Sequence, residues 1–96
     1  MSYNKIVTIT VNGLIWDDWN KEHIAQHGVL PEEVEDICHG KCEVIESYRK
    51  RLLIIGKTQK GRLLAIVLSP EDRNLKLYEN GIYYPITAFD KKEVKK

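Results

Sequence analysis

The chain has 96 residues, of which 43% are hydrophobic and 30% are charged, and its formal net charge is +1. This length suits one domain built around one core and excludes a second core. No apolar run approaches the roughly eighteen residues of a membrane span, and two cysteines are too few for a disulfide-stapled secreted scaffold.

The charge is distributed unevenly along the chain. Residues 17–36 carry seven acidic side chains and one basic one, whereas residues 41–62 carry seven basic and two acidic ones. A local cationic surface of this kind can bind a polyanion, although ordinary solvated lysines produce the same pattern. The opening "MSYNKIVTITVNG" lacks the pattern of a signal peptide, so we expect a cytoplasmic protein with no membrane partner.

The first predicted element is a strand over residues 5–11. Val7, Ile9 and Val11 alternate with threonines there, and Asn12–Gly13 suits a turn directly afterwards. Residues 1–13 are therefore expected to form an N-terminal strand extension.

The periodicity then becomes helical. One helical face carries Trp16, Trp19, His23 and His27. This stripe predicts a helix over residues 18–27, in which Asp17 or Asp18 caps the start and Gly28 closes the end.

The segment "VLPEEVEDICHG" predicts a second helix. Pro31 suits the first helical position, the acidic residues after it complement the positive end of the helix dipole, and Gly40 supplies the stop. Its inward face is formed by Val34, Ile37 and Cys38.

Four apolar stretches in the rest of the chain predict strands. They are "CEVIES" (42–47), "RLLIIG" (51–56), "RLLAIVLS" (62–69) and "GIYYPITAF" (81–89). Residues 57–61 form a hairpin loop, and the continuous apolar runs 52–55 and 63–68 indicate central strands. Residues 69–81 form the longest loop, and residues 91–96 are a short helix or a basic tail. We therefore expect residues 1–96 to form one α+β domain, with two helices packed on an antiparallel sheet of three to five strands.

Two pairs of residues have the spacing of metal ligands. His23 and His27 are four apart, as are Cys38 and Cys42, and together they would make a Cys2His2 zinc set. Each also has a simpler explanation, because Cys38 is in phase with the apolar face of the second helix and His27 can bond to helix-end carbonyls. A small zinc-binding domain is thus a minor alternative, and no metal or other cofactor is our expectation.

The order of motifs resembles the BrnT family, which are small RelE-like ribonuclease toxins of type II toxin–antitoxin systems. The resemblance is carried by "WDDWNKEHIAQHGVLPEEVEDI", "YRKRLLIIGKTQKGRLLAIVL" and "YYPITAFDKKE", within about residues 14–94. It implies a RelE-like fold, metal-independent RNA cleavage, and neutralisation by a ribbon-helix-helix antitoxin. The chain departs from the family pattern at Phe89 and Val94, where the family has arginines.

Metal-independent RNA cleavage needs a base for the 2′-hydroxyl, a cation for the phosphorane and an acid for the leaving oxygen. The RelE-like toxins that the chain resembles place such groups on a concave face of the sheet. The resemblance therefore makes Arg51, Arg62 and His27 the candidate catalytic residues. The candidate RNA-binding residues are Arg49, Lys57, Tyr84, Lys91 and Lys92.

The sequence leaves several alternatives open. The loss of the two family arginines favours a weakened or inactive domain that binds RNA or a protein through the same fold. Arg51 and Arg62 can equally be solubility residues or partners of acidic side chains. A homodimer or a toxin–antitoxin hetero-oligomer is compatible with either function.

Overall fold

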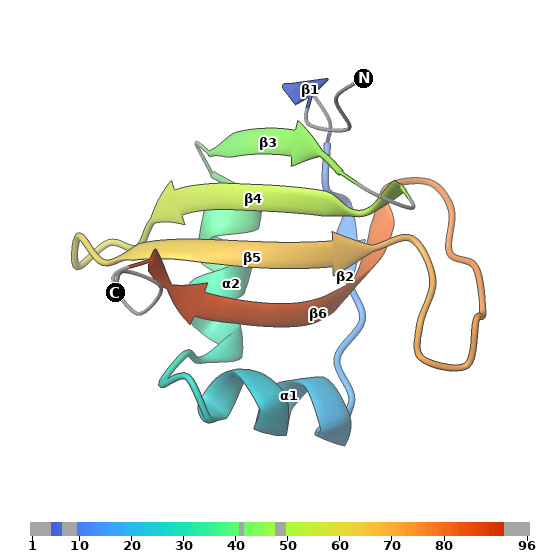
Figure 1. Ribbon diagram of the computed structural model, residues 1–96, viewed down its shortest axis with the longest axis horizontal. Helices are drawn as coiled ribbons and strands as arrows, with labels where there is room; N and C mark the ends of the chain where they lie inside the picture. Colours follow the sequence, from blue (N-terminus) through green and yellow to red (C-terminus); the bar gives the residue numbers. More distant parts are fainter. Residues whose placement is uncertain (1–4, 7–9, 41, 48–49, 92–96) are drawn as a thin grey trace.

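The computed structural model describes residues 5–6, 10–40, 42–47 and 50–91. Its elements in chain order are β1 (Lys5–Ile6), β2 (Gly13–Leu14), α1 (Asp18–Ala25), α2 (Pro31–Cys38), β3 (Glu43–Glu46), β4 (Leu52–Lys57), β5 (Leu63–Ser69) and β6 (Ile82–Asp90). Figure 1 shows one sheet with α2 on one face and α1 alongside the strand β6. The predicted α+β class with two helices is confirmed.

The strands lie in the order β1-β3-β4-β5-β6-β2, so the apolar runs that predicted central strands do lie inside the sheet. Neighbouring strands are antiparallel except β2, which is parallel to β6. The predicted antiparallel sheet of three to five strands is thus present in β1, β3, β4, β5 and β6, and β2 adds a parallel edge strand that was not predicted.

The cause of this difference is the segment that had been predicted as a turn. The backbone N–H groups of Asn12 and Gly13 both donate to the carbonyl of Gly81, at 2.7 and 3.3 Å. The chain thus continues as a short edge strand beside β6. Of the strand predicted over residues 5–11, Val7 and Ile9 lie outside the described residues, and Val11 is buried in the core.

Helix α1 is fixed at its start by a reciprocal cap. Asn20 N–H donates to the Asp17 carboxylate, and Asp17 N–H donates to the Asn20 side chain, both at 2.9 Å. The buried Asn20 amide also donates to the carbonyls of Ile15 and Pro85, which ties α1 to β6. The helix ends at Ala25, two residues before the predicted end, and Gly28 turns the chain with a φ of +72°.

The core lies between α2 and one face of the sheet. Ile54, Leu64 and Ile66 point into it from the central strands, and Val34 and Ile37 enter it from α2 as predicted. Helix α2 begins at Pro31 and ends at Cys38, with His39 following as its cap.

The other face of the sheet is covered by no described helix (Figure 1). On β4, Leu53 and Ile55 are half-buried, whereas their neighbours Leu52 and Ile54 are buried. We call this the open face, which Ile45, Leu53, Ile55, Leu63, Val67, Thr87 and Phe89 form.

Candidate functional site

The sheet separates the two arginines that were predicted to act together. Strands β4 and β5 are antiparallel, with Leu52 opposite Leu68 and Lys57 opposite Leu63. Arg51 and Arg62, which directly precede these strands, therefore lie at opposite ends of the sheet, about 20 Å apart along the strand direction. They do not form one catalytic site.

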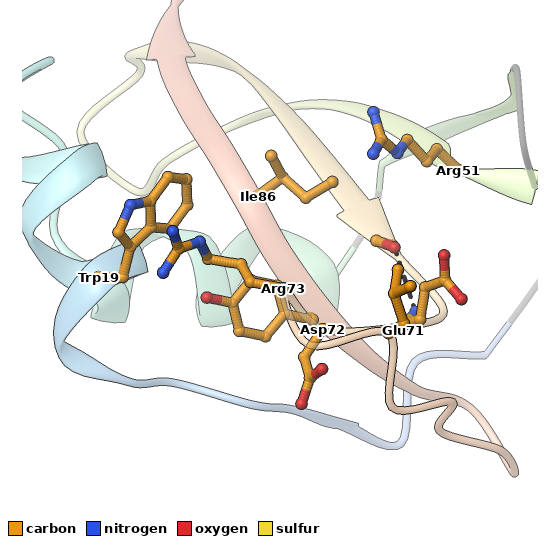
Figure 2. Close-up of a pocket in the computed structure, with 9 residues that line it drawn as sticks. Trp19, Arg51, Glu71, Asp72, Arg73 and Ile86 are labelled. Atoms are coloured by element: carbon orange, nitrogen blue, oxygen red, sulfur yellow. Dashed lines mark hydrogen bonds between the residues drawn. The ribbon is translucent and has the colours of Figure 1, made fainter.

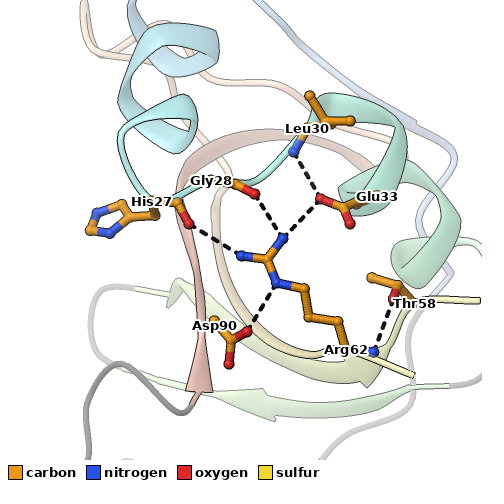
Figure 3. A network of polar contacts seen from close by, with 7 residues as sticks. All are labelled: His27, Gly28, Leu30, Glu33, Thr58, Arg62 and Asp90. Atoms are coloured by element: carbon orange, nitrogen blue, oxygen red, sulfur yellow. Dashed lines mark hydrogen bonds and ion pairs between the residues drawn. The ribbon is translucent and has the colours of Figure 1, made fainter. Parts of the chain in front are cut away.

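Arg62 joins three parts of the fold (Figure 3). Its Nε donates to Asp90 at the end of β6 at 2.9 Å, and its Nη1 lies 3.4 Å from Glu33 in α2. The guanidinium also donates to the backbone carbonyls of Gly28 at 2.7 Å and His27 at 3.3 Å. We call this set of contacts the Arg62 clamp. Since two carboxylates and two carbonyls occupy the guanidinium, Arg62 is a structural residue in this state.

His27 belongs to a row of rings along the outside of α1. Trp19 stacks on His23 at 4.9 Å between centroids, with an angle of 6° between the ring planes. His23 meets His27 edge-on at 5.7 Å, and His27 lies 6.2 Å from Phe89. This aromatic row joins α1, the turn that follows it and β6 through ring contacts.

The four residues of the zinc alternative do not come together. The histidines belong to the aromatic row, whereas Cys38 is only 6% exposed in the core. Burial, followed by the neighbouring Cys42 and Glu35, raises the pKa of Cys38 to about 12, so its thiol stays neutral. Among the described residues, no group of three or more His, Cys, Asp or Glu side chains is arranged to hold a metal ion. The described residues therefore do not assemble the Cys2His2 set that the sequence spacing suggested.

The predicted RNA-binding residues also divide between the two ends of the sheet. Lys57 ends β4 and Lys91 follows β6, at the end that holds the Arg62 clamp. Tyr84 lies near the start of β6, at the opposite end of the sheet, which it shares with Arg51. Arg49 and Lys92 lie outside the described residues.

Arg51 and Tyr84 line a cavity of about 200 Å³ beside the loop between β5 and β6. Figure 2 shows this cavity, with Ile86 between Trp19 and Arg73 on one side and Arg51 and Glu71 on the other. We call it the arginine pocket. It is lined by Trp19, Arg51, Ser69, Glu71, Asp72, Arg73, Leu75, Tyr84 and Ile86.

Arg73 was not among the predicted site residues. Its guanidinium carbon lies 4.3 Å from the centroid of the Trp19 ring, whose other face stacks on His23. A guanidinium that stacks through its face keeps its N–H edge available for an anion. Neither the Arg73 guanidinium nor the Arg51 guanidinium makes a hydrogen bond or ion pair with a described residue. The pocket therefore presents two cations that no described carboxylate neutralises by contact.

Tyr84 lines the arginine pocket, but its ring is buried. It is 1% exposed, and its hydroxyl donates to both oxygens of Asp17, at 3.0 and 2.9 Å. Burial and the Asp17 carboxylate raise the pKa of Tyr84 well above its ordinary value. Its hydroxyl is thus a fixed donor to the cap of α1, and its buried ring is not placed to stack on a base.

The carboxylates of Asp72 and Glu71 both line the pocket, but they differ in the hydrogen bonds that they already accept. The Asp72 carboxylate accepts bonds from the N–H groups of Asn74 and Lys76 and from the Tyr78 hydroxyl, each at 2.9 Å. These bonds, the one from Lys76 first, lower the pKa of Asp72. The Glu71 carboxylate has no hydrogen bond or ion pair with a described residue. Of these two carboxylates, therefore, only that of Glu71 has no described donor.

No family model matches this chain, and no curated protein or solved structure matches it significantly. The likeness to BrnT toxins consequently rests on the sequence motifs alone. Across the described residues, no helix has the length and apolar character needed to cross a membrane.

Proposed function

We propose that this protein binds RNA, with the arginine pocket holding the phosphate backbone. The observation that carries the proposal is the pair Arg51 and Arg73, two guanidinium groups in one cavity without a described anionic partner. A planar guanidinium binds two phosphate oxygens at once, and stacking on Trp19 holds Arg73 in place before a ligand arrives. The BrnT-like motifs support RNA as the polyanion.

Binding of a fluorescent twelve-nucleotide RNA tests this proposal. We expect Arg51→Ala and Arg73→Ala each to weaken binding five- to tenfold and to reduce the slope of log affinity against log salt by about 0.7. Lys60→Ala is the matched control, because it removes the same charge from the exposed hairpin away from the pocket. If both arginine variants bind as tightly as Lys60→Ala, the arginine pocket is not the RNA site.

The second candidate function is metal-independent RNA cleavage, as a BrnT-like endoribonuclease toxin. The observation that favours it is the pair His23 and His27, whose rings lie 5.7 Å apart on the outside of α1. Two imidazoles at this separation can act as the base and the acid of one reaction. Arg62 fixes the backbone of His27 and so positions it.

Incubation with RNA in the presence of EDTA separates the two candidates. Cleavage that survives EDTA and is lost in His27→Ala supports the ribonuclease. Binding without any cleaved product, in wild type and His27→Ala alike, leaves RNA binding as the function.

We also propose that a protein antitoxin of the ribbon-helix-helix type covers the open face. Leu53, Ile55 and Val67 form a contiguous apolar surface there, and such surfaces mark sites of protein association. Growth arrest on induction in bacteria, rescued by the product of a small neighbouring reading frame, is the expected result for a toxin and its antitoxin. Normal growth and intact bulk RNA on induction would count against the toxin.

A further inference from the structure

The arginine pocket contains a hydrogen-bond acceptor for which the proposed function gives no use. Glu71 lines the pocket on the same side of Ile86 as Arg51, and Figure 2 shows its carboxylate directed away from that of Asp72. Its backbone is fixed, since Glu71 N–H donates to the Ser69 hydroxyl at 3.1 Å and Glu71 pairs with Leu77 across the loop. This carboxylate is half-buried and has no described partner, and since its oxygens are not fully buried, it is open to a donor from a ligand.

A phosphate cannot be that donor, because a phosphodiester carries only acceptors and negative charge. The group in RNA that can donate to a carboxylate beside a bound phosphate is the ribose 2′-hydroxyl. DNA lacks this hydroxyl and would leave Glu71 facing the backbone as an uncompensated negative charge.

We infer that the arginine pocket holds one unpaired ribonucleotide, with Arg51 and Arg73 on neighbouring phosphates and Glu71 accepting a hydrogen bond from the 2′-hydroxyl. This inference rests on the proposed RNA binding and names the residue that selects ribose. Figure 2 places the two guanidinium groups on opposite sides of the apolar Ile86 side chain. A single strand that crosses Ile86 therefore contacts both guanidinium groups.

The size of the cavity selects a single strand over a duplex. A volume of about 200 Å³ accommodates part of one nucleotide and is too small for that nucleotide together with a pairing partner. Recognition of unpaired nucleotides lets side chains reach both the sugar and the phosphate of the same unit.

The test compares the binding of one sequence as single-stranded RNA, single-stranded DNA and duplex RNA. We expect wild type to prefer single-stranded RNA to single-stranded DNA by about tenfold, the contribution of a hydrogen bond to a charged group. Duplex RNA should also bind more weakly than single-stranded RNA, because paired strands do not fit a cavity of about 200 Å³. Glu71→Ala should bind RNA and DNA equally, mainly through weaker RNA binding. Glu79→Ala, which changes an exposed acid of the same loop, should keep the full preference.

The variant Glu71→Gln shows whether a loss of the RNA preference in Glu71→Ala comes only from misfolding. It keeps an oxygen acceptor in the same place, so it should retain part of the RNA preference and a native circular dichroism spectrum. An RNA preference that is unchanged in Glu71→Ala, or a wild type that binds RNA and DNA equally well, overturns the inference while RNA binding stands. A wild type that binds no nucleic acid overturns the proposed function itself.

Discussion

Individual side chains in this protein have roles that their sequence positions only partly reveal. Arg51 and Arg62 both precede an apolar run, yet one lines a cavity and the other is clamped by acceptors. The sequence did contain the signal that separates them, because a hairpin loop was predicted over residues 57–61 and the strands that flank such a loop run in opposite directions. Arg73 had no such signal, since its contact with Trp19 joins a loop to a helix far away in the chain.

Arg62→Ala should lower the free energy of unfolding by about 2 kcal/mol. The substitution leaves Asp90, Glu33 and two carbonyls without their shared donor, in a place where the Arg62 side chain is only 29% exposed. Urea denaturation measures the effect, and Arg62→Lys should recover less than half of it because one ammonium cannot reach four acceptors. Arg51→Ala is the control and should change stability by less than about 0.5 kcal/mol. Equal effects of Arg62→Ala and Arg51→Ala would show that the Arg62 clamp does not stabilise the fold.

Cys38 should make the fold less stable in alkali. Its pKa of about 12 in the folded protein lies above the ordinary value of 9.0, mainly because of burial. Above pH 9 the Cys38 thiol releases its proton in the unfolded protein but keeps it in the folded protein. The contribution of the neutral thiol to the free energy of unfolding is therefore complete below pH 9 and is lost as the pH rises toward 12. The expected loss approaches 1.4 kcal/mol per pH unit.

Chemical denaturation of wild type and Cys38→Ala between pH 8 and pH 11 measures this contribution. The variant should be less stable at pH 8, because it loses packing, but its stability should fall less steeply above pH 9. Parallel curves for the two proteins would show that Cys38 does not titrate as its burial implies.

The helices and strands were predictable where a local pattern decides them. The Asp17 cap, Pro31 at the start of α2 and the apolar runs of β4 and β5 act within a few residues, and their predicted bounds agree with the structure to within one or two residues. The pairing of β2 with β6 was not predictable in this way, because residues about seventy positions apart specify it together. An Asn-Gly pair also favours a turn in most sequences, and here the tertiary pairing prevails over that preference.

Gly81→Ala should destabilise the protein more than Gly61→Ala. Both glycines have positive φ values, +78° and +85°, so each variant incurs backbone strain of about 1 kcal/mol. A Cβ at Gly81 would also lie 2.8 Å from the backbone oxygen of Thr10 and 2.7 Å from the Asn12 side chain, whereas a Cβ at Gly61 meets nothing within 4 Å. Thermal unfolding of the two variants should show the larger loss at Gly81, and equal losses would mean that the segment around Thr10 is not held against β6.

The molecule as a whole is a half-covered sheet, with a packed side and an open side. The sequence predicted both layers, but it did not predict that α1 would lie beside β6 instead of on the sheet. Helical periodicity identifies which face of a helix is apolar, and it contains no information about which edge or face of the sheet that helix will contact. The candidate site depends on this placement, since Trp19 reaches the arginine pocket only from the edge.

Ile54 and Ile55 provide a test of this two-sided architecture. Ile54 is completely buried against α2 and the core, so Ile54→Ala should cost about 3 kcal/mol of stability. Ile55 is the next residue and points to the open face, where it is only half-buried, so Ile55→Ala should cost about 1 kcal/mol. Urea denaturation of the pair measures the difference. Equal costs would show that another part of the chain covers the open face.

The parallel pairing of β2 with β6 also sets the order in which a newly made chain can be completed. Residues 13–14 leave the ribosome long before residues 82–83, and until then the early segment has no strand with which to pair. The hairpin of β4 and β5 joins neighbouring segments, whereas closure of the sheet edge by β2 has to wait until β6 has been made. Chains that stop before β6 should therefore leave the segment around Gly13 and Leu14 open to proteases.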